Sequence, residues 1–127
     1  MAQQGTQKLV CNTRIYLDSR KLLNAMLDII PSLPRDYKYT VGAELQKIGI
    51  GLIYEVSAAY INRDPRITLE HLTEFQSQFE TLKTLVRIAG ERRWVQGRGR
   101  FAALIELMDG IGKQTSAWKN AVLQRMA

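Results

Sequence analysis

A stretch of helical periodicity with almost no polar side constrains the fold of this chain more than any other feature. Between residues 34 and 62, apolar side chains recur at steps of three and four, the spacing of one face of an α-helix. These side chains are Val41, Leu45, Ile48, Leu52, Val56 and Ala59. Ile50, Ile53 and Tyr54 cover much of the opposite side. A helix that is apolar nearly all round has to be covered by other elements, within the subunit or across an oligomer interface.

Two glycines, Gly49 and Gly51, lie in the middle of this helix. Each costs about 1 kcal/mol there relative to alanine. Because a glycine lets another backbone come close, we expect a neighbouring helix to approach this point. The Gly-Ile-Gly segment is not a phosphate-binding loop, because no strand precedes it and no turn follows it.

The rest of the chain has the same helical period. A first stripe is formed by Leu9, Tyr16, Leu23, Leu27 and Ile30, with Leu22, Met26 and Ile29 beside it. Pro31 and Pro34 end that helix, because proline disfavours helical geometry in the residue before it. A third seam is formed by Leu72, Phe75, Phe79, Leu82, Val86 and Ala89. A fourth is formed by Phe101, Leu104, Met108, Ile111, Thr115, Trp118 and Val122.

These patterns predict helices at about residues 8–30, 36–62, 68–94 and 98–124. Asp36 is expected to cap the second helix and Thr68 the third, since both residue types favour the N-cap. Four helices of this length with short connections predict a single all-α domain over residues 1–127. The expected architecture is an antiparallel, up-down-up-down four-helix bundle.

Simple sequence features place the chain among proteins of the cytoplasm. Its apolar runs fall well short of the about 20 residues that span a bilayer, and the first ten residues do not resemble a secretory signal. A single cysteine, Cys11, excludes an intrachain disulfide and fits a reducing compartment. We interpret Cys11 as a small residue on a helix face.

Catalytic and metal-binding patterns are missing from the sequence. His71 is the only histidine, and no cysteine or second histidine stands at ligand spacing. We therefore expect His71 to be a partly exposed surface residue. The glutamates of the third helix lie off its apolar seam, and no Glu-x-x-His motif of a di-iron bundle occurs. The sequence thus predicts a protein that is not an enzyme and that holds neither a cofactor nor a metal.

Basic residues are the better clue to function. The net charge is +6, which favours anionic partners such as nucleic acid. Between residues 83 and 100 only Glu91 opposes six basic residues, which are Lys83, Arg87, Arg92, Arg93, Arg98 and Arg100. A smaller group, Arg35, Lys38 and Arg63, lies at the two ends of the second helix. For the six residues, charge alone fits equally well with a nucleic-acid interface and with a solvated polar face. For the smaller group, exposed loop charge is the preferred interpretation.

Two motifs add a resemblance to a known family. The first is Pro34-Arg35 followed by Lys38-Tyr39-Thr40-Val41-Gly42, and the second runs from Ile111-Gly112-Lys113 to Trp118-Lys119. Over about residues 14–123 the chain is similar to the accessory variability determinant proteins of diversity-generating retroelements. Proteins encoded in intervening sequences of 23S ribosomal RNA genes are related to the same group.

The resemblance implies a ring or barrel-like homo-oligomer, a homopentamer, without a catalytic site. It also implies partnership with a reverse transcriptase and with template-repeat RNA and cDNA, in support of mutagenic reverse transcription. Lys83 and Arg87 match basic positions of the family and are expected to contact nucleic acid or the polymerase. The alternative is a structural or protein-interaction bundle of the intervening-sequence type, without a dedicated role in nucleic-acid binding.

Overall fold

A computed structural model describes residues 13–127 of the chain. The predicted helix start at residue 8, Leu9 and Cys11 lie outside the described residues. The helices are α2 (Arg14–Ile29), α3 (Arg35–Lys38), α4 (Val41–Ile61), α5 (Pro65–Glu91) and α6 (Arg98–Met126), and a 3-10 turn, η2 (Ile30–Ser32), follows α2. No strand occurs in the part of the chain that the structure describes. The all-helical prediction is therefore confirmed for these residues.

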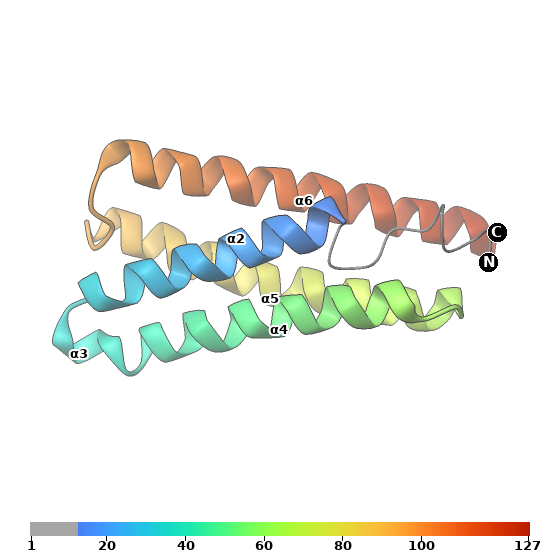
Figure 1. The fold of residues 1–127 in the computed structure, drawn as a ribbon, viewed down its shortest axis with the longest axis horizontal. Coiled ribbons are helices and arrows are strands. Elements are labelled where there is room, and N and C mark those ends of the chain that lie inside the picture. The colour runs from blue at the N-terminus through green and yellow to red at the C-terminus, as the bar shows by residue number, and fades with distance from the viewer. Residues whose placement is uncertain (1–12) are drawn as a thin grey trace.

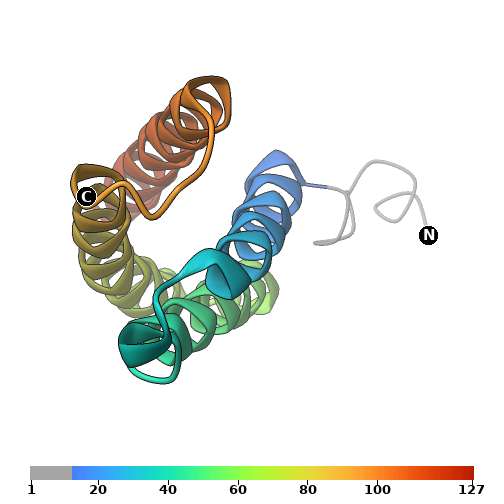
Figure 2. The ribbon, with the colours of Figure 1, turned by 90° about the vertical axis from the view of Figure 1, so that its left-hand side faces the viewer.

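The four long helices lie side by side around one core (Figures 1 and 2). Helix α4 packs against α2 and α5, and α6 packs against α5 and α2. In Figure 1 the chain reverses direction at each connection between long helices. The turn after α2, the short helix α3, the end of α5 and the start of α6 therefore gather at the left end of that view.

The core is built from the seams predicted for the last three long helices. All six seam residues of α5 are buried. In α4 the seam is buried from Leu45 to Ala59, and in α6 Phe101 and Trp118 are partly buried beside five buried residues. Each buried leucine, valine or phenylalanine contributes about 1.5–3 kcal/mol relative to an exposed one. This apolar burial is the main stabilising contribution to the bundle.

The stripe predicted for the first helix is wrong by about one position. The apolar side chains that α2 buries are Ile15, Leu22, Met26 and Ile29, and Leu27 is 42% exposed. Two apolar stripes run side by side on this helix, and periodicity does not tell which of them faces the core. The packing of α2 between α4 and α6 decides in favour of the second stripe.

The predicted start of the second helix is also wrong. Asp36 does not cap it, because Arg35–Lys38 forms a separate turn, α3, whose N-cap is Pro34. Tyr39 and Thr40 then form a turn, and α4 begins at Val41. Gly42, in the first turn of α4, allows a close approach, since a Cβ on it would lie 3.2 Å from Ile30 Cγ2. The first turn of α4 thus packs tightly against the turn that follows α2.

Thr68 does not cap the third helix. Helix α5 begins at Pro65, a favoured first helical residue, and the carboxylate of Asp64 accepts a 3.0 Å hydrogen bond from Arg66 N. Thr68 is buried one turn later, and its hydroxyl lies within hydrogen-bond distance of the carbonyl oxygens of Ala59, Asn62 and Asp64, at 3.3, 3.2 and 3.3 Å. Its single proton can be donated to one of these oxygens at a time. The hydroxyl therefore fastens the α4–α5 connection rather than the helix start.

The two glycines of α4 serve different contacts. A Cβ on Gly49 would lie 3.6 Å from Leu23 Cα, so the backbone of α2 does come close here and the expectation is confirmed. Gly51 instead leaves room for the side chain of Gln78 from α5, so the expectation of a backbone contact is wrong at this position. Among the described residues, no helix has the length and hydropathy needed to cross a membrane.

Candidate nucleic-acid interface

The end of α5 holds one arginine in a left-handed backbone conformation. Arg93 N donates to Gly90 O at 3.0 Å and Trp94 N donates to Ala89 O at 2.8 Å, which is the pattern of a Schellman motif. Arg93 has φ 61° at the position that usually holds glycine. This turn ends α5 at Glu91, before the predicted residue 94. It also directs the chain into the connection to α6.

An aromatic and cationic cluster closes the same end of the bundle. The rings of Tyr37 and Trp94 lie 4.9 Å apart. The Arg92 guanidinium lies 5.4 Å from the Tyr37 ring centroid and 5.0 Å from that of Trp94. Ser32 Oγ donates to Trp94 O at 3.0 Å. These contacts fasten α3 and the turn after α2 to the end of α5.

Six of the eight candidate residues therefore lie at one end of the molecule, which we call the basic end. They are Arg35 and Lys38 on α3, Arg92 and Arg93 after α5, and Arg98 and Arg100 on the first turn of α6. These residues form two groups that are far apart in the sequence, and the fold brings the two groups to the same end of the bundle. Arg100 lies 3.9 Å from Asp28, both of them well exposed, so this pair contributes little to stability.

Lys83 and Arg87 do not belong to the basic end, because they lie on α5 before its C-terminal end at Glu91. Lys83 Nζ is 2.7 Å from Glu80 Oε1 and 5.1 Å from the centroid of the Phe79 ring. Lys83 lines a groove of about 710 Å³ between α5 and α6, together with Lys113. The exposed side chain of Arg87 makes no hydrogen bond, ion pair or ring contact with the other described residues.

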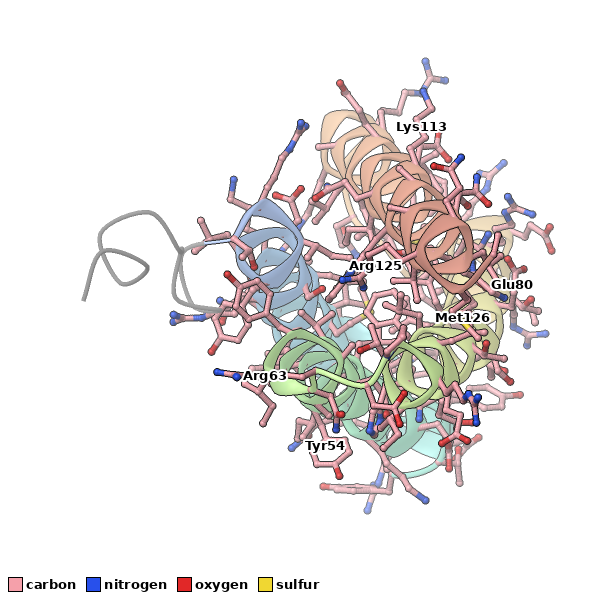
Figure 3. All side chains as sticks on the ribbon, turned by 90° about the vertical axis from the view of Figure 1, so that its right-hand side faces the viewer. Tyr54, Arg63, Glu80, Lys113, Arg125 and Met126 are labelled. Carbon is pink, nitrogen blue, oxygen red and sulfur yellow. The ribbon has the colours of Figure 1, made fainter. Side chains whose placement is uncertain are left out.

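Arg63 lies at the opposite end of the bundle, in the connection between α4 and α5 (Figure 3). The two ends of α4 therefore do not form one basic surface. Arg35 and Lys38 belong to the basic end, and Arg63 does not.

His71 is partly exposed, as the sequence predicts, and it is also paired across the contact between α4 and α5. Its Nδ1 lies 2.7 Å from Oε1 of Glu55, which is buried on α4. The edge of the Tyr54 ring faces the imidazole, with 6.3 Å between the centroids. The sequence signal for this pair was Glu55, a carboxylate beside the seam of an apolar helix, because a buried charge needs a partner. Across residues 13–127, no cluster of three or more potential metal ligands occurs.

The outer face of α4 exposes large apolar side chains. Ile50 is 52% exposed, Tyr54 64% and Ile61 73%. Their spacing of four and seven residues places them on one face of the helix. Figure 3 shows Tyr54 pointing away from the bundle. This face is the part of the apolar second helix that the single subunit leaves uncovered.

A family model described as bAvd-like matches residues 9–122, a range that includes all of α2, α3, α4 and α5 and most of α6. No curated protein matches the chain.

Proposed function

Since the chain belongs to the bAvd-like family of accessory variability determinant proteins, we propose that it is the accessory subunit of a diversity-generating retroelement. In this role it binds the reverse transcriptase and the template-repeat RNA or cDNA, and it supports mutagenic reverse transcription. The family consists of accessory, non-catalytic proteins. The protein therefore contributes binding and positioning, and the polymerase contributes the chemistry.

The basic end is the observation that carries the nucleic-acid part of the proposal. Two segments that are distant in the sequence, residues 35–38 and 92–100, place six basic side chains there, and five of these are arginines. A guanidinium holds a phosphate through two parallel hydrogen bonds, which a lysine cannot do. The phosphate backbone supplies most of the affinity of such an interface, and its binding weakens with salt. The basic end therefore suits a phosphate backbone.

The exposed face of α4 supports the proposed assembly. Large apolar side chains exposed along one face of a helix favour a protein interface at that face. We assign Ile50, Tyr54 and Ile61 to contacts between subunits of a ring-like homo-oligomer, a homopentamer. A closed ring would repeat the basic end around its axis, so that one RNA could contact several subunits and bind with higher avidity.

Lys83 and Arg87 are assigned to the reverse transcriptase. They lie on the side of the bundle, apart from the basic end, and the groove beside Lys83 has an apolar floor formed by Phe79 and Met108. Apolar surface inside a charged rim is the usual composition of a protein-binding site. This composition favours a polymerase surface over a phosphate backbone at the groove.

A second candidate is a structural or protein-interaction bundle of the intervening-sequence type. The observation in its favour is the same α4 face, which needs a protein partner whether or not nucleic acid binds. In that case binding to RNA would be weak, blind to sequence, and lost near physiological salt.

Affinity purification of the tagged protein from cells that express the partner genes tests the proposal. The expected result is co-purification of a reverse transcriptase and one dominant structured RNA. The triple variant Arg35→Glu, Lys38→Glu, Arg98→Glu should lose the RNA. The control Arg63→Glu, Arg66→Glu, Arg125→Glu makes the same charge change at the opposite end and should retain it. Recovery of neither partner with the unaltered protein would favour the second candidate.

A further inference from the structure

A cavity of about 470 Å³ opens at the basic end, between the end of α5 and the start of α6. Its lining residues are Gly90, Arg93, Val95, Gly97, Arg98, Phe101 and Ala102. This volume lies in the range of about 300–1,000 Å³ that is typical of small-molecule sites. The cavity is therefore large enough for one nucleotide.

The cavity holds two guanidinium groups that no other side chain engages. Among the described residues, neither Arg93 nor Arg98 has a side-chain hydrogen bond, an ion pair or a ring contact. By contrast, Arg92 lies over two rings and Arg100 lies near Asp28. No acidic residue belongs to the lining, and the first turn of α6 has none. An anion that enters would thus meet two unpaired positive charges and no competing carboxylate.

The remaining lining is apolar and includes an aromatic ring. Phe101 lies so close to Gly90 that a Cβ at position 90 would overlap the ring. This contact between α5 and α6 holds the ring in the cavity wall, to which Val95 also belongs, and both residues pack on the core. Aromatic rings of this kind bind unpaired bases by stacking, with little preference among bases. The cavity thus combines a phosphate-binding side and a base-binding side.

We propose that this cavity takes one unpaired nucleotide of a single-stranded nucleic acid. Its phosphate would lie between Arg93 and Arg98, and its base would lie against Val95 and Phe101. The inference rests on the proposed function, because it specifies how the basic end holds the RNA or cDNA. A base in a duplex is stacked and paired, so the cavity selects single strands.

The test fills the cavity without changing any charge. Ala102 is exposed and lines the cavity, whereas the adjacent Ala103 is exposed and does not line it. Ala102→Trp and the matched control Ala103→Trp are compared with the unaltered protein by fluorescence anisotropy, after circular dichroism has verified their helix content. The probes are a twelve-residue oligouridylate, a blunt RNA duplex of the same length, and free uridine monophosphate.

Ala102→Trp should weaken oligouridylate binding at least about fivefold, the lower end of the effect of losing one stacked base. It should change duplex binding less than about twofold, since phosphate contacts alone hold a duplex. Ala103→Trp should change neither. Arg93→Ala with Arg98→Ala should lower the salt dependence of oligouridylate binding by about 0.7 per lost phosphate contact.

Unchanged oligouridylate binding by Ala102→Trp would overturn the proposed cavity site. The proposed function would survive that result as long as the triple variant of the basic end still loses RNA. If uridine monophosphate competes at the same concentration as the oligonucleotide, the ligand is a free nucleotide, and the assignment to a nucleic-acid chain is wrong.

Discussion

His71 Nδ1 on α5 lies 2.7 Å from Glu55 Oε1 on α4, and this contact joins the two helices. Helix α4 is the most apolar helix of the bundle. The Glu55 side chain is only 8% exposed. No other side-chain hydrogen bond to its carboxylate is found among the described residues. The pair therefore satisfies a polar group that the surrounding apolar residues cannot.

Removing the imidazole should destabilise the fold more than an ordinary surface substitution. His71→Ala leaves the buried acceptor without its partner, which costs about 1–3 kcal/mol of unfolding free energy. Urea denaturation measures this loss. Glu74→Ala on the same helix, an exposed glutamate, should shift the midpoint far less. Equal shifts for the two variants would show that the His71–Glu55 contact has no special role.

Substituting alanine for two helical glycines, Gly90 and Gly110, should change the stability of the bundle in opposite directions. Gly90→Ala should destabilise the bundle by about 1–3 kcal/mol, because the new methyl group overlaps the Phe101 ring. Gly110 lies in α6, where an added Cβ meets nothing within 4 Å. Gly110→Ala should therefore raise stability by up to about 1 kcal/mol through helix propensity. Thermal unfolding of both variants checks the prediction, and a gain for Gly90→Ala would contradict the packing at the basic end.

The sequence was sufficient for the seams of α5 and α6, because each had a single main apolar stripe. Leu72 and Phe75 are buried as the spacing predicts. On α2, Leu22 and Leu23 lie on neighbouring stripes, and only contact with α4 and α6 decides between them. Thr68 had the right residue type for a cap, but Asp64 followed by Pro65 made the better helix start.

The sequence predicted which basic residues belong to the candidate site, but it did not predict how they are arranged in space. Arg35 and Arg98 are far apart in the sequence, and periodicity gives no distance between helix ends. The cluster of Tyr37, Arg92 and Trp94 brings the segments together. The pairing of Lys83 with Glu80 was not predicted, although their i, i+3 spacing allows it. The cavity beside Arg93 depends on a backbone turn that no sequence signal indicates.

Charges on the outer face of α4 should break the proposed oligomer without unfolding the subunit. Ile50→Lys with Tyr54→Lys places two like charges on the exposed stripe, where burying them at an interface is unfavourable. Sedimentation should show a smaller particle with unchanged helix content. Leu17→Lys on α2, at a residue that is 43% exposed, is the control. If the double variant keeps the size of the unaltered protein, the contact face lies elsewhere.

Substitution of Arg93 by glycine should raise the stability of the protein and weaken its binding to nucleic acid. Its φ of 61° places it in the left-handed region, where a residue with a Cβ is strained by about 1–2 kcal/mol relative to glycine. Arg93→Gly should therefore raise the free energy of unfolding by about 1 kcal/mol. The same substitution removes one of the two unpaired guanidinium groups of the cavity, so binding to single-stranded RNA should weaken. Arg93→Lys keeps both the strain and the charge and should change stability little. A protein that gained stability from Arg93→Gly without losing affinity would show that the strained arginine is not held there for phosphate binding.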